Sequence, residues 1–209
     1  MSEAETEPEL TLVLRGTVID CASRTELRVL ERAVLGINAC GRVTVVEGEH
    51  EEDNLIPGGV LTLRSGETAR LSSQCVVVQL PPRGFVCPGL VDTHTHAPQF
   101  AFTGNGYSMQ LLEWLTTYTF PAEAKFADLE YAARVSTNAV KRTLHAGTTS
   151  CVYFATIHTD AALQLGRIAS ELGQRAFVGK VNMDQNAPDD YVESTADSLA
   201  ETERFVRLM

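Results

Sequence analysis

The sequence predicts an α/β fold in which a small β-rich module precedes strands that alternate with helices. Three observations carry this prediction. Short β-like runs separated by turn signals fill residues 10–80, a Pro-Pro-Arg-Gly break follows at 81–84, and apolar strands then alternate with helical stretches. Such alternation is typical of a parallel sheet, because each crossover between parallel strands needs about a dozen residues or more.

The predicted β-module covers residues 10–82 and follows an acidic tail, residues 1–9. An acidic stretch and a Pro-Gly-Gly turn at 57–59 separate its runs. Like-charge blocks are typical of solvated loops, so we expect the stretch at 47–53 to lie at the surface rather than to bind a cation. The β-like runs are Leu12–Ile19, Ala33–Ile37, Arg42–Val46 and Cys75–Leu80.

The second predicted region, residues 83–209, contains about three β/α units. A complete (β/α)₈ barrel needs eight units and about 250 residues. We therefore expect the N-terminal portion of a TIM-type barrel, preceded by the β-module and incomplete in this chain. The predicted strands are Phe85–Thr93, Ser150–Phe154 and Ala176–Met183, and the predicted helices are Leu111–Tyr118, Asp128–Leu144, Ala161–Leu172 and one that begins near Ser194.

Composition and charge exclude several classes of protein. The chain is 44% hydrophobic and 21% charged, as in ordinary globular proteins, and its net charge of −10 would repel nucleic acid. No apolar run approaches the roughly 20 residues that span a bilayer, and the polar start lacks the features of a secretory signal. We expect a cytoplasmic protein with no nucleic-acid or membrane partner. The five cysteines lack CxxC spacing and are predicted to be free thiols.

The segment Pro88–His96, PGLVDTHTH, carries the main chemical signal. Alternate side chains of a strand point to the same face, so His94 and His96 are expected to project together into the barrel interior. Imidazole is a ligand for zinc, iron or nickel, and barrel enzymes place their chemistry at the C-terminal ends of the strands. An isolated HxH pair is weak evidence, but in this strand it predicts a metal site.

Several stretches of the second region resemble the amidohydrolase superfamily and, within it, the guanine deaminase family. TFPAE and GQRAFVGKVNMD are more specific to this resemblance than HxH, whereas the first 80 residues match less finely. The stretches are PGLVDTHTHAPQF (88–100), LLEWLTTYTFPAE (111–123), YFATIHTDAALQL (153–165) and GQRAFVGKVNMD (173–184).

The resemblance implies hydrolytic deamination of guanine to xanthine and ammonia at a zinc ion, with Fe²⁺ as an open alternative. It implies His94 and His96 as metal ligands, His96 and Gln99 as substrate contacts, and a homodimer for the full-length protein. Trp114, the only tryptophan, and Phe154 are further candidates for the substrate pocket, although Trp114 also fits a core position. His158 does not match a ligand position of the family.

The same resemblance implies that later strands supply the remaining metal ligands, and it places the glutamate that shuttles protons beyond Met209. No catalytic acid or base can be assigned in this chain, and we expect the chain to be inactive alone. Two alternatives remain open. One is another amidohydrolase that deaminates a different heterocycle, and the other is a noncatalytic fragment or interaction module.

Overall fold

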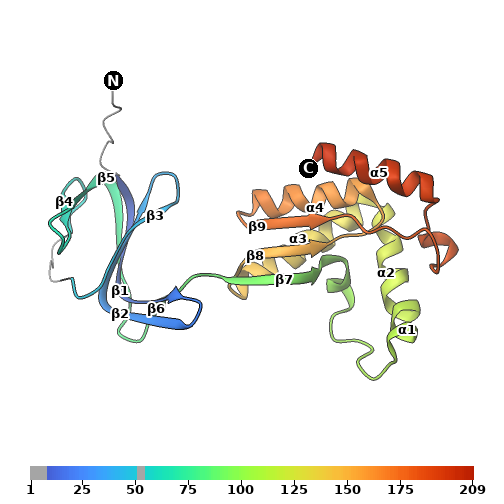
Figure 1. Ribbon diagram of the computed structural model, residues 1–209, viewed down its shortest axis with the longest axis horizontal. Coiled ribbons are helices and arrows are strands. Elements are labelled where there is room, and N and C mark those ends of the chain that lie inside the picture. Colours follow the sequence, from blue (N-terminus) through green and yellow to red (C-terminus); the bar gives the residue numbers. More distant parts are fainter. Residues whose placement is uncertain (1–8, 51–54) are drawn as a thin grey trace. The chain divides into compact units, whose positions relative to one another are not determined.

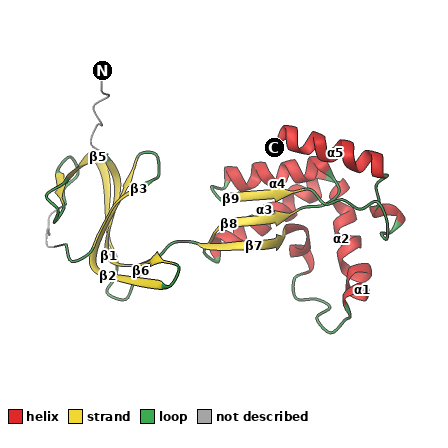
Figure 2. Cartoon of the chain, viewed as in Figure 1, coloured by secondary structure: helices red, strands yellow, loops and turns green. Residues whose placement is uncertain are grey.

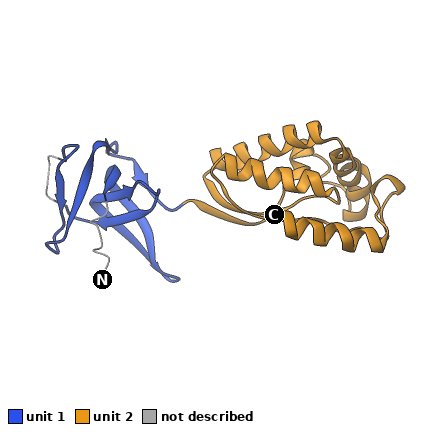
Figure 3. Ribbon diagram, turned by 90° about the horizontal axis from the view of Figure 1, so that it is seen from above, with its two compact units in different colours: residues 1–88 blue, residues 89–209 orange. Residues whose placement is uncertain are grey.

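The computed structural model describes residues 9–50 and 55–209, and the chain divides into two units, residues 1–88 and 89–209 (Figure 3). Residues 1–8 of the predicted acidic tail and 51–53 of the acidic stretch lie outside the described residues. The predicted α/β fold is confirmed, because unit 1 is built of strands and unit 2 of parallel strands with helices (Figure 2).

Unit 1 forms one sheet with the strand order β3-β2-β1-β5-β4, and β6 also pairs with β1 (Figure 1). The β1 and β2 strands form a long antiparallel hairpin, whereas β5 runs parallel to β1. Leu10, Val13 and Leu71 are fully or almost fully buried in its core. The strands are β1 (Leu10–Ser23), β2 (Glu26–Asn38), β3 (Val43–Glu47), β4 (Val60–Thr62), β5 (Thr68–Gln79) and β6 (Phe85–Val86).

The predicted strand Phe85–Thr93 is wrong in its first half. Phe85 and Val86 form β6 and pair with Thr17 and Val18 of β1, and the strand of unit 2 starts only at Leu90. Proline at position 88 has no N–H to donate to a sheet. A Cβ at Gly89 would lie 2.0 Å from Thr149 Oγ1, so only glycine fits this close approach.

Unit 2 contains a parallel sheet, order β7-β8-β9, whose three strands are joined by helices (Figure 1). Its strands are β7 (Leu90–His96), β8 (Thr148–Phe154) and β9 (Arg175–Gly179). Its longer helices are α3 (Leu129–His145), α4 (Thr159–Glu171) and α5 (Thr195–Leu208). Its short helical segments are η1 (Ala97–Phe102), α1 (Leu111–Trp114), η2 (Leu115–Thr119), α2 (Phe120–Ala124), η3 (Lys125–Ala127) and η4 (Asp189–Tyr191).

Helix α3 shows how the local sequence sets these elements. Asp128 caps its start, and the carboxylate accepts hydrogen bonds from the backbone N–H groups of Glu130 and Tyr131 at 2.9 and 3.3 Å. The helix ends before Gly147, which has a positive φ of 89°. Its apolar residues, which include Ala139 and Val140, pack against the sheet and α4.

The two faces of the β7-β8-β9 sheet differ in what covers them. Cys151 and Tyr153 of β8 are buried in the core formed with α3 and α4. The alternate residues of the same sheet point to the opposite face, where Phe177 is 65% exposed and where the His94 and His96 rings contact Phe154. The sheet therefore has one face covered by helices and one that carries the imidazoles. Within residues 9–50 and 55–209, no helix is long and apolar enough to cross a membrane.

The segment predicted as one helix, Leu111–Tyr118, consists of α1 followed by the π-helical turn η2. Pro121 follows at the start of α2, has no N–H to donate, and would clash with a carbonyl one turn earlier in a regular α-helix. We attribute the wider π turn to this proline. The Thr116 hydroxyl also donates to the carbonyls of Leu112 and Glu113 at 3.1 Å.

A buried hydrogen-bond network lies beneath β8. The Tyr153 hydroxyl, which is fully buried, donates to Gln174 Oε1 at 2.7 Å, and Gln174 Nε2 donates to Thr143 Oγ1 and the Thr148 carbonyl at 3.0 and 2.9 Å. Burial raises the pKa of Tyr153 to about 12, so this hydroxyl remains a donor at neutral pH. The network joins α3, β8 and the start of β9.

We predict that Gln174→Leu lowers the free energy of unfolding of unit 2 by about 2 to 3 kcal/mol, because it removes the acceptor of the Tyr153 hydroxyl and the side-chain donors to Thr143 and the Thr148 carbonyl at a buried site, and leaves Tyr153 only its contact with Thr143. Urea unfolding followed by the fluorescence of Trp114, the only tryptophan, measures this change. The control Gln185→Leu, at an exposed loop position, should change it by no more than about 0.5 kcal/mol. Equal effects of the two variants would contradict the role of the network.

Candidate metal centre

The predicted ligands His94 and His96 lie at the C-terminal end of β7 and come together as expected. Their Nε2 atoms are 3.2 Å apart, and their ring centroids are 5.1 Å apart. His94 is exposed and His96 is half-buried. Burial lowers the pKa of His96, and the neighbouring His94 lowers it further. A neutral imidazole offers the lone pair that a metal needs.

The spacing of the two Nε2 atoms fits a shared metal ion. Two nitrogen ligands at 2.0–2.1 Å from a tetrahedral zinc lie about 3.3 Å from each other. The same 3.2 Å separation allows one ring to donate a hydrogen bond to the other, and a metal would take the place of that proton. The histidines thus fit two positions of a tetrahedral site. No group of three or more His, Cys, Asp or Glu side chains is placed to hold a metal within the described residues.

Phe154, at the C-terminal end of β8, packs against both imidazoles. It pairs with His96 in the sheet, its ring stacks on the His96 ring with a centroid distance of 5.1 Å, and it lies 4.5 Å from the His94 ring centroid. His96 Nδ1 is buried and has no hydrogen-bond partner in the described part of the chain. Packing against Phe154 and the contact with His94 therefore orient the His96 ring.

Asp92, which the sequence analysis did not single out, stabilises the backbone of the same strand. Its Oδ1 accepts a hydrogen bond from the His94 N–H at 3.0 Å. This bond, followed by one from the Thr95 side chain, lowers the pKa of Asp92. The carboxylate therefore stays ionised, and it fixes the backbone that presents the imidazoles.

A cavity of about 610 Å³ adjoins the imidazoles, within the size range of small-molecule sites. Three elements bring the predicted residues to it: β7 carries His94 and His96, η1 carries Gln99, and α1 carries Trp114. Trp114 Nε1 donates to the Asn105 carbonyl at 3.3 Å, and its ring lies 5.6 Å from the Phe102 ring. Trp114 thus forms part of the wall, half-buried, rather than lying in the core.

The contacts of His158 are with Thr156 and Tyr191, and His158 does not line the cavity beside the imidazoles. Its Nδ1 is 3.1 Å from Thr156 Oγ1, and its ring centroid is 6.0 Å from that of Tyr191. Burial lowers the pKa of His158.

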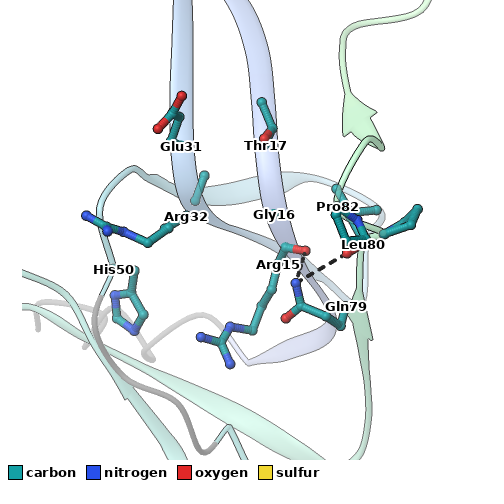
Figure 4. Close-up of a pocket in the computed structure, with 11 residues that line it drawn as sticks. Arg15, Gly16, Thr17, Glu31, Arg32, His50, Gln79, Leu80 and Pro82 are labelled. Atoms are coloured by element: carbon teal, nitrogen blue, oxygen red, sulfur yellow. Dashed lines mark hydrogen bonds between the residues drawn. The ribbon is translucent and has the colours of Figure 1, made fainter.

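A second cavity, of about 460 Å³, lies in unit 1 (Figure 4). Charged and polar side chains, including Glu31, Arg32 and His50, surround it. Gln79 Nε2 donates to the carbonyls of Arg15 and Leu80 at 3.2 and 3.4 Å and closes one side. This cavity lacks a pair of converging imidazoles, so we do not place the metal chemistry there.

The main feature that the sequence analysis missed is a buried acid, Glu123 of α2. Its side chain accepts a hydrogen bond from the hydroxyl of the fully buried Tyr191 at 2.5 Å. Burial raises the pKa of Glu123, an effect that hydrogen bonds from Tyr191 and Gln99 partly oppose. A sequence signal existed, because Glu123 lies between the buried apolar residues Ala122 and Phe126.

A family model described as "Amidohydrolase family" matches residues 85–209. The chain therefore belongs to the amidohydrolase family, whose members generally depend on a metal. This family places the parallel strands and helices of unit 2 in a barrel of the TIM type, as the sequence predicts.

Within the family, the chain is similar to guanine deaminases. It is 42% identical over 203 residues to guanine deaminase of Mus musculus, an alignment that covers 97% of this chain and 42% of that protein. It is 46% identical over 113 residues to guanine deaminase of Escherichia coli strain K12, which covers 54% of this chain and 25% of that protein. The chain thus spans well under half the length of these relatives.

The fold of the chain is also similar to that of a solved guanine deaminase. Guanine deaminase from C. acetobutylicum, crystallised with guanine bound in its active site, superimposes with a TM-score of 0.76 and 28% identity. The match covers 93% of this chain and 42% of that chain. The arrangement of secondary structure is therefore shared with the corresponding part of a guanine-binding deaminase.

We predict that Phe154→Ala weakens zinc binding by about 10-fold, the lower end of the effect expected when a group that orients a ligand is lost. Phe154→Tyr keeps the ring against both imidazoles and should bind zinc within about threefold of the wild type. Competition with a chromophoric zinc chelator in the full-length protein measures both affinities. An unchanged affinity of Phe154→Ala would exclude the ring as the orienting contact.

Proposed function

We propose that the protein carrying this chain catalyses the hydrolytic deamination of guanine to xanthine and ammonia. The observation that carries the proposal is the pair of Nε2 atoms, 3.2 Å apart beside a cavity of about 610 Å³, in a chain 42% identical to a guanine deaminase. In this reaction the oxygen of water forms a bond to C2 of the purine. The bond between C2 and the exocyclic amino nitrogen breaks, and that nitrogen leaves as ammonia.

We propose zinc as the metal, with His94 and His96 as two of its ligands and Fe²⁺ as the alternative. Zinc accepts imidazole nitrogen at 2.0–2.1 Å, which agrees with the spacing of the two rings. When bound, the ion lowers the pKa of a water molecule, so that a hydroxide nucleophile forms near neutral pH. Within residues 9–50 and 55–209 no group of three or more His, Cys, Asp or Glu side chains is placed to hold a metal, so we propose that other parts of the protein supply the remaining ligands and the catalytic acid and base.

The chain's own residues bind and orient the purine in this proposal. Gln99 lines the cavity with an amide that both donates and accepts hydrogen bonds, which suits the mixed edge of a purine. The Trp114 ring forms an apolar wall, and the Phe154 ring holds the imidazoles beneath the substrate. We propose that His96, which is half-buried against Phe154 and lines the cavity, contacts the substrate as well as the metal.

We further propose that the protein acts in the cytoplasm and that its full-length form is a homodimer. The first proposal rests on the similarity of the chain to guanine deaminases. The second rests on the family resemblance alone. Sedimentation of the full-length protein determines its oligomeric state.

The activity of the full-length protein toward different substrates distinguishes guanine deamination from the two alternative functions. The full-length zinc-loaded protein should convert guanine to xanthine, and His96→Ala should lower kcat/KM by at least about 1,000-fold, because a metal ligand is lost. His145→Ala, at an exposed position at the end of α3, should retain the wild-type rate. Faster hydrolysis of adenosine, cytosine or a chlorotriazine would favour another amidohydrolase. No hydrolysis of any of the four compounds would favour the interaction module.

Zinc affinity of residues 1–209 alone is a separate prediction. Two imidazoles without further ligands bind zinc far more weakly than four, so we expect the isolated chain to lose zinc on dialysis against buffer and to form no xanthine. Metal analysis of the dialysed chain tests this. Retention of one zinc per chain would mean that residues 1–209 supply more ligands than His94 and His96.

A further inference from the structure

The cavity beside the imidazoles has a buried carboxylate behind one of its walls. Glu123, on α2, has 5% of its surface exposed, and its Oε2 accepts a hydrogen bond from the Tyr191 hydroxyl at 2.5 Å. Both residues are remote from the protein surface, and the mechanism proposed above uses neither. A buried carboxylate costs free energy unless hydrogen bonds stabilise it, so its partners indicate its role.

Gln99 is the second partner of this carboxylate. The η1 segment, which carries Gln99, packs against α2, and the Gln99 side chain lies near enough to Glu123 to lower the carboxyl pKa against the effect of burial. A carboxylate only accepts hydrogen bonds, whereas an amide has one NH₂ donor and one carbonyl acceptor. If the Gln99 NH₂ faces Glu123, the carbonyl oxygen of the amide is left for the cavity that Gln99 lines.

The Tyr191 hydroxyl is itself held in one orientation. It donates its single proton to Glu123 Oε2, because a carboxylate oxygen can only accept. The loop that carries Tyr191 is anchored by a buried ion pair between Lys180 and Glu193 at 2.7 Å. The carboxylate thus has a fixed donor, the Tyr191 hydroxyl, on one side. On the other side, the Gln99 amide can adopt either of two orientations.

We propose that Glu123 is a positioning residue that fixes the amide of Gln99 with its carbonyl oxygen toward the cavity, so that the site selects ligands that present a hydrogen-bond donor there. The inference rests on the proposed function and specifies its substrate recognition. Guanine offers such donors at N1–H, at the exocyclic amino group and at N9–H. A site that presents only an acceptor at this point discriminates against purines that lack the matching donor.

The isosteric variant Glu123→Gln should reverse the orientation of the Gln99 amide. The Tyr191 hydroxyl still donates to the oxygen of the new amide, whose NH₂ is then the group that faces Gln99. Gln99 must turn its carbonyl toward that donor and present its own NH₂ to the cavity. The volume of the side chain is unchanged, and the cost of burying a charge is removed, so the fold should be retained.

The first test compares ligand preference in the full-length zinc-loaded protein. The probes are guanine, hypoxanthine, 1-methylguanine and 9-methylguanine, because each of the last three lacks one donor of guanine. The KM for guanine and the inhibition constants of the other three give the discrimination against each missing donor. For at least one probe, Glu123→Gln should reduce this discrimination by about 10-fold or more, while Glu113→Gln, an exposed carboxylate on α1, leaves it unchanged.

Tyr191→Phe provides a second comparison, because it removes a hydrogen bond of Glu123 but leaves the carboxylate as an acceptor for Gln99. If Glu123 had only a structural role, Glu123→Gln and Tyr191→Phe would change the ligand preference in the same way. We expect Tyr191→Phe to keep the wild-type ligand preference. A loss of discrimination among the purines equal to that of Glu123→Gln would overturn the proposal. Equal preference of Glu123→Gln and wild type for all four purines would also overturn it.

The second test needs no ligand and no activity. In the ¹⁵N-labelled protein, the side-chain amide of Gln99, identified by its loss in Gln99→Glu, should show at least one proton that exchanges about 10-fold or more slowly than those of the exposed Gln185. Exchange as fast as that of Gln185 would overturn the inference even if the protein deaminates guanine. Slow exchange in a protein that does not deaminate guanine would instead contradict the proposed function while the Gln99 orientation stands.

Discussion

The two-residue repeat of β7 is the constraint on which the site depends. His94 and His96 point to the same face because they are two residues apart in a strand, and parallel pairing of β7 with β8 places Phe154 against both rings. A slip of one residue in this pairing would turn the imidazoles toward the helices. The buried side chains of Cys151 and Tyr153, which occupy the helix-covered face, oppose such a slip.

The helical segments then build the cavity around this fixed pair. The η1 segment directly follows β7 and carries Gln99, so chain connection alone keeps this residue near the end of the strand. The α1 segment brings Trp114, which approaches so closely that a Cβ at Gly106, whose φ is 75°, would lie 2.6 Å from the indole ring. Rigid strands thus hold the metal ligands, whereas turns and short helices shape the pocket.

The sequence predicts those parts of the molecule that follow from local periodicity. Strand alternation places His94 and His96, and the Asp128 cap with Gly147 bounds α3 within one residue of the prediction. It does not predict that Phe85 pairs with β1, because the choice of partner strand depends on tertiary contacts. Nor does it predict the partners of Glu123, since Tyr191 lies 68 residues away and joins it only in the folded chain. Local patterns specify elements, while packing decides which polar groups meet.

The most direct test of this account is anomalous diffraction at the zinc edge from crystals of the zinc-loaded full-length protein. The account predicts one peak about 2.0–2.1 Å from Nε2 of both His94 and His96, at the end of β7 and beside the cavity lined by Gln99. A peak at another site, or one bound by only one of the two histidines, would contradict it.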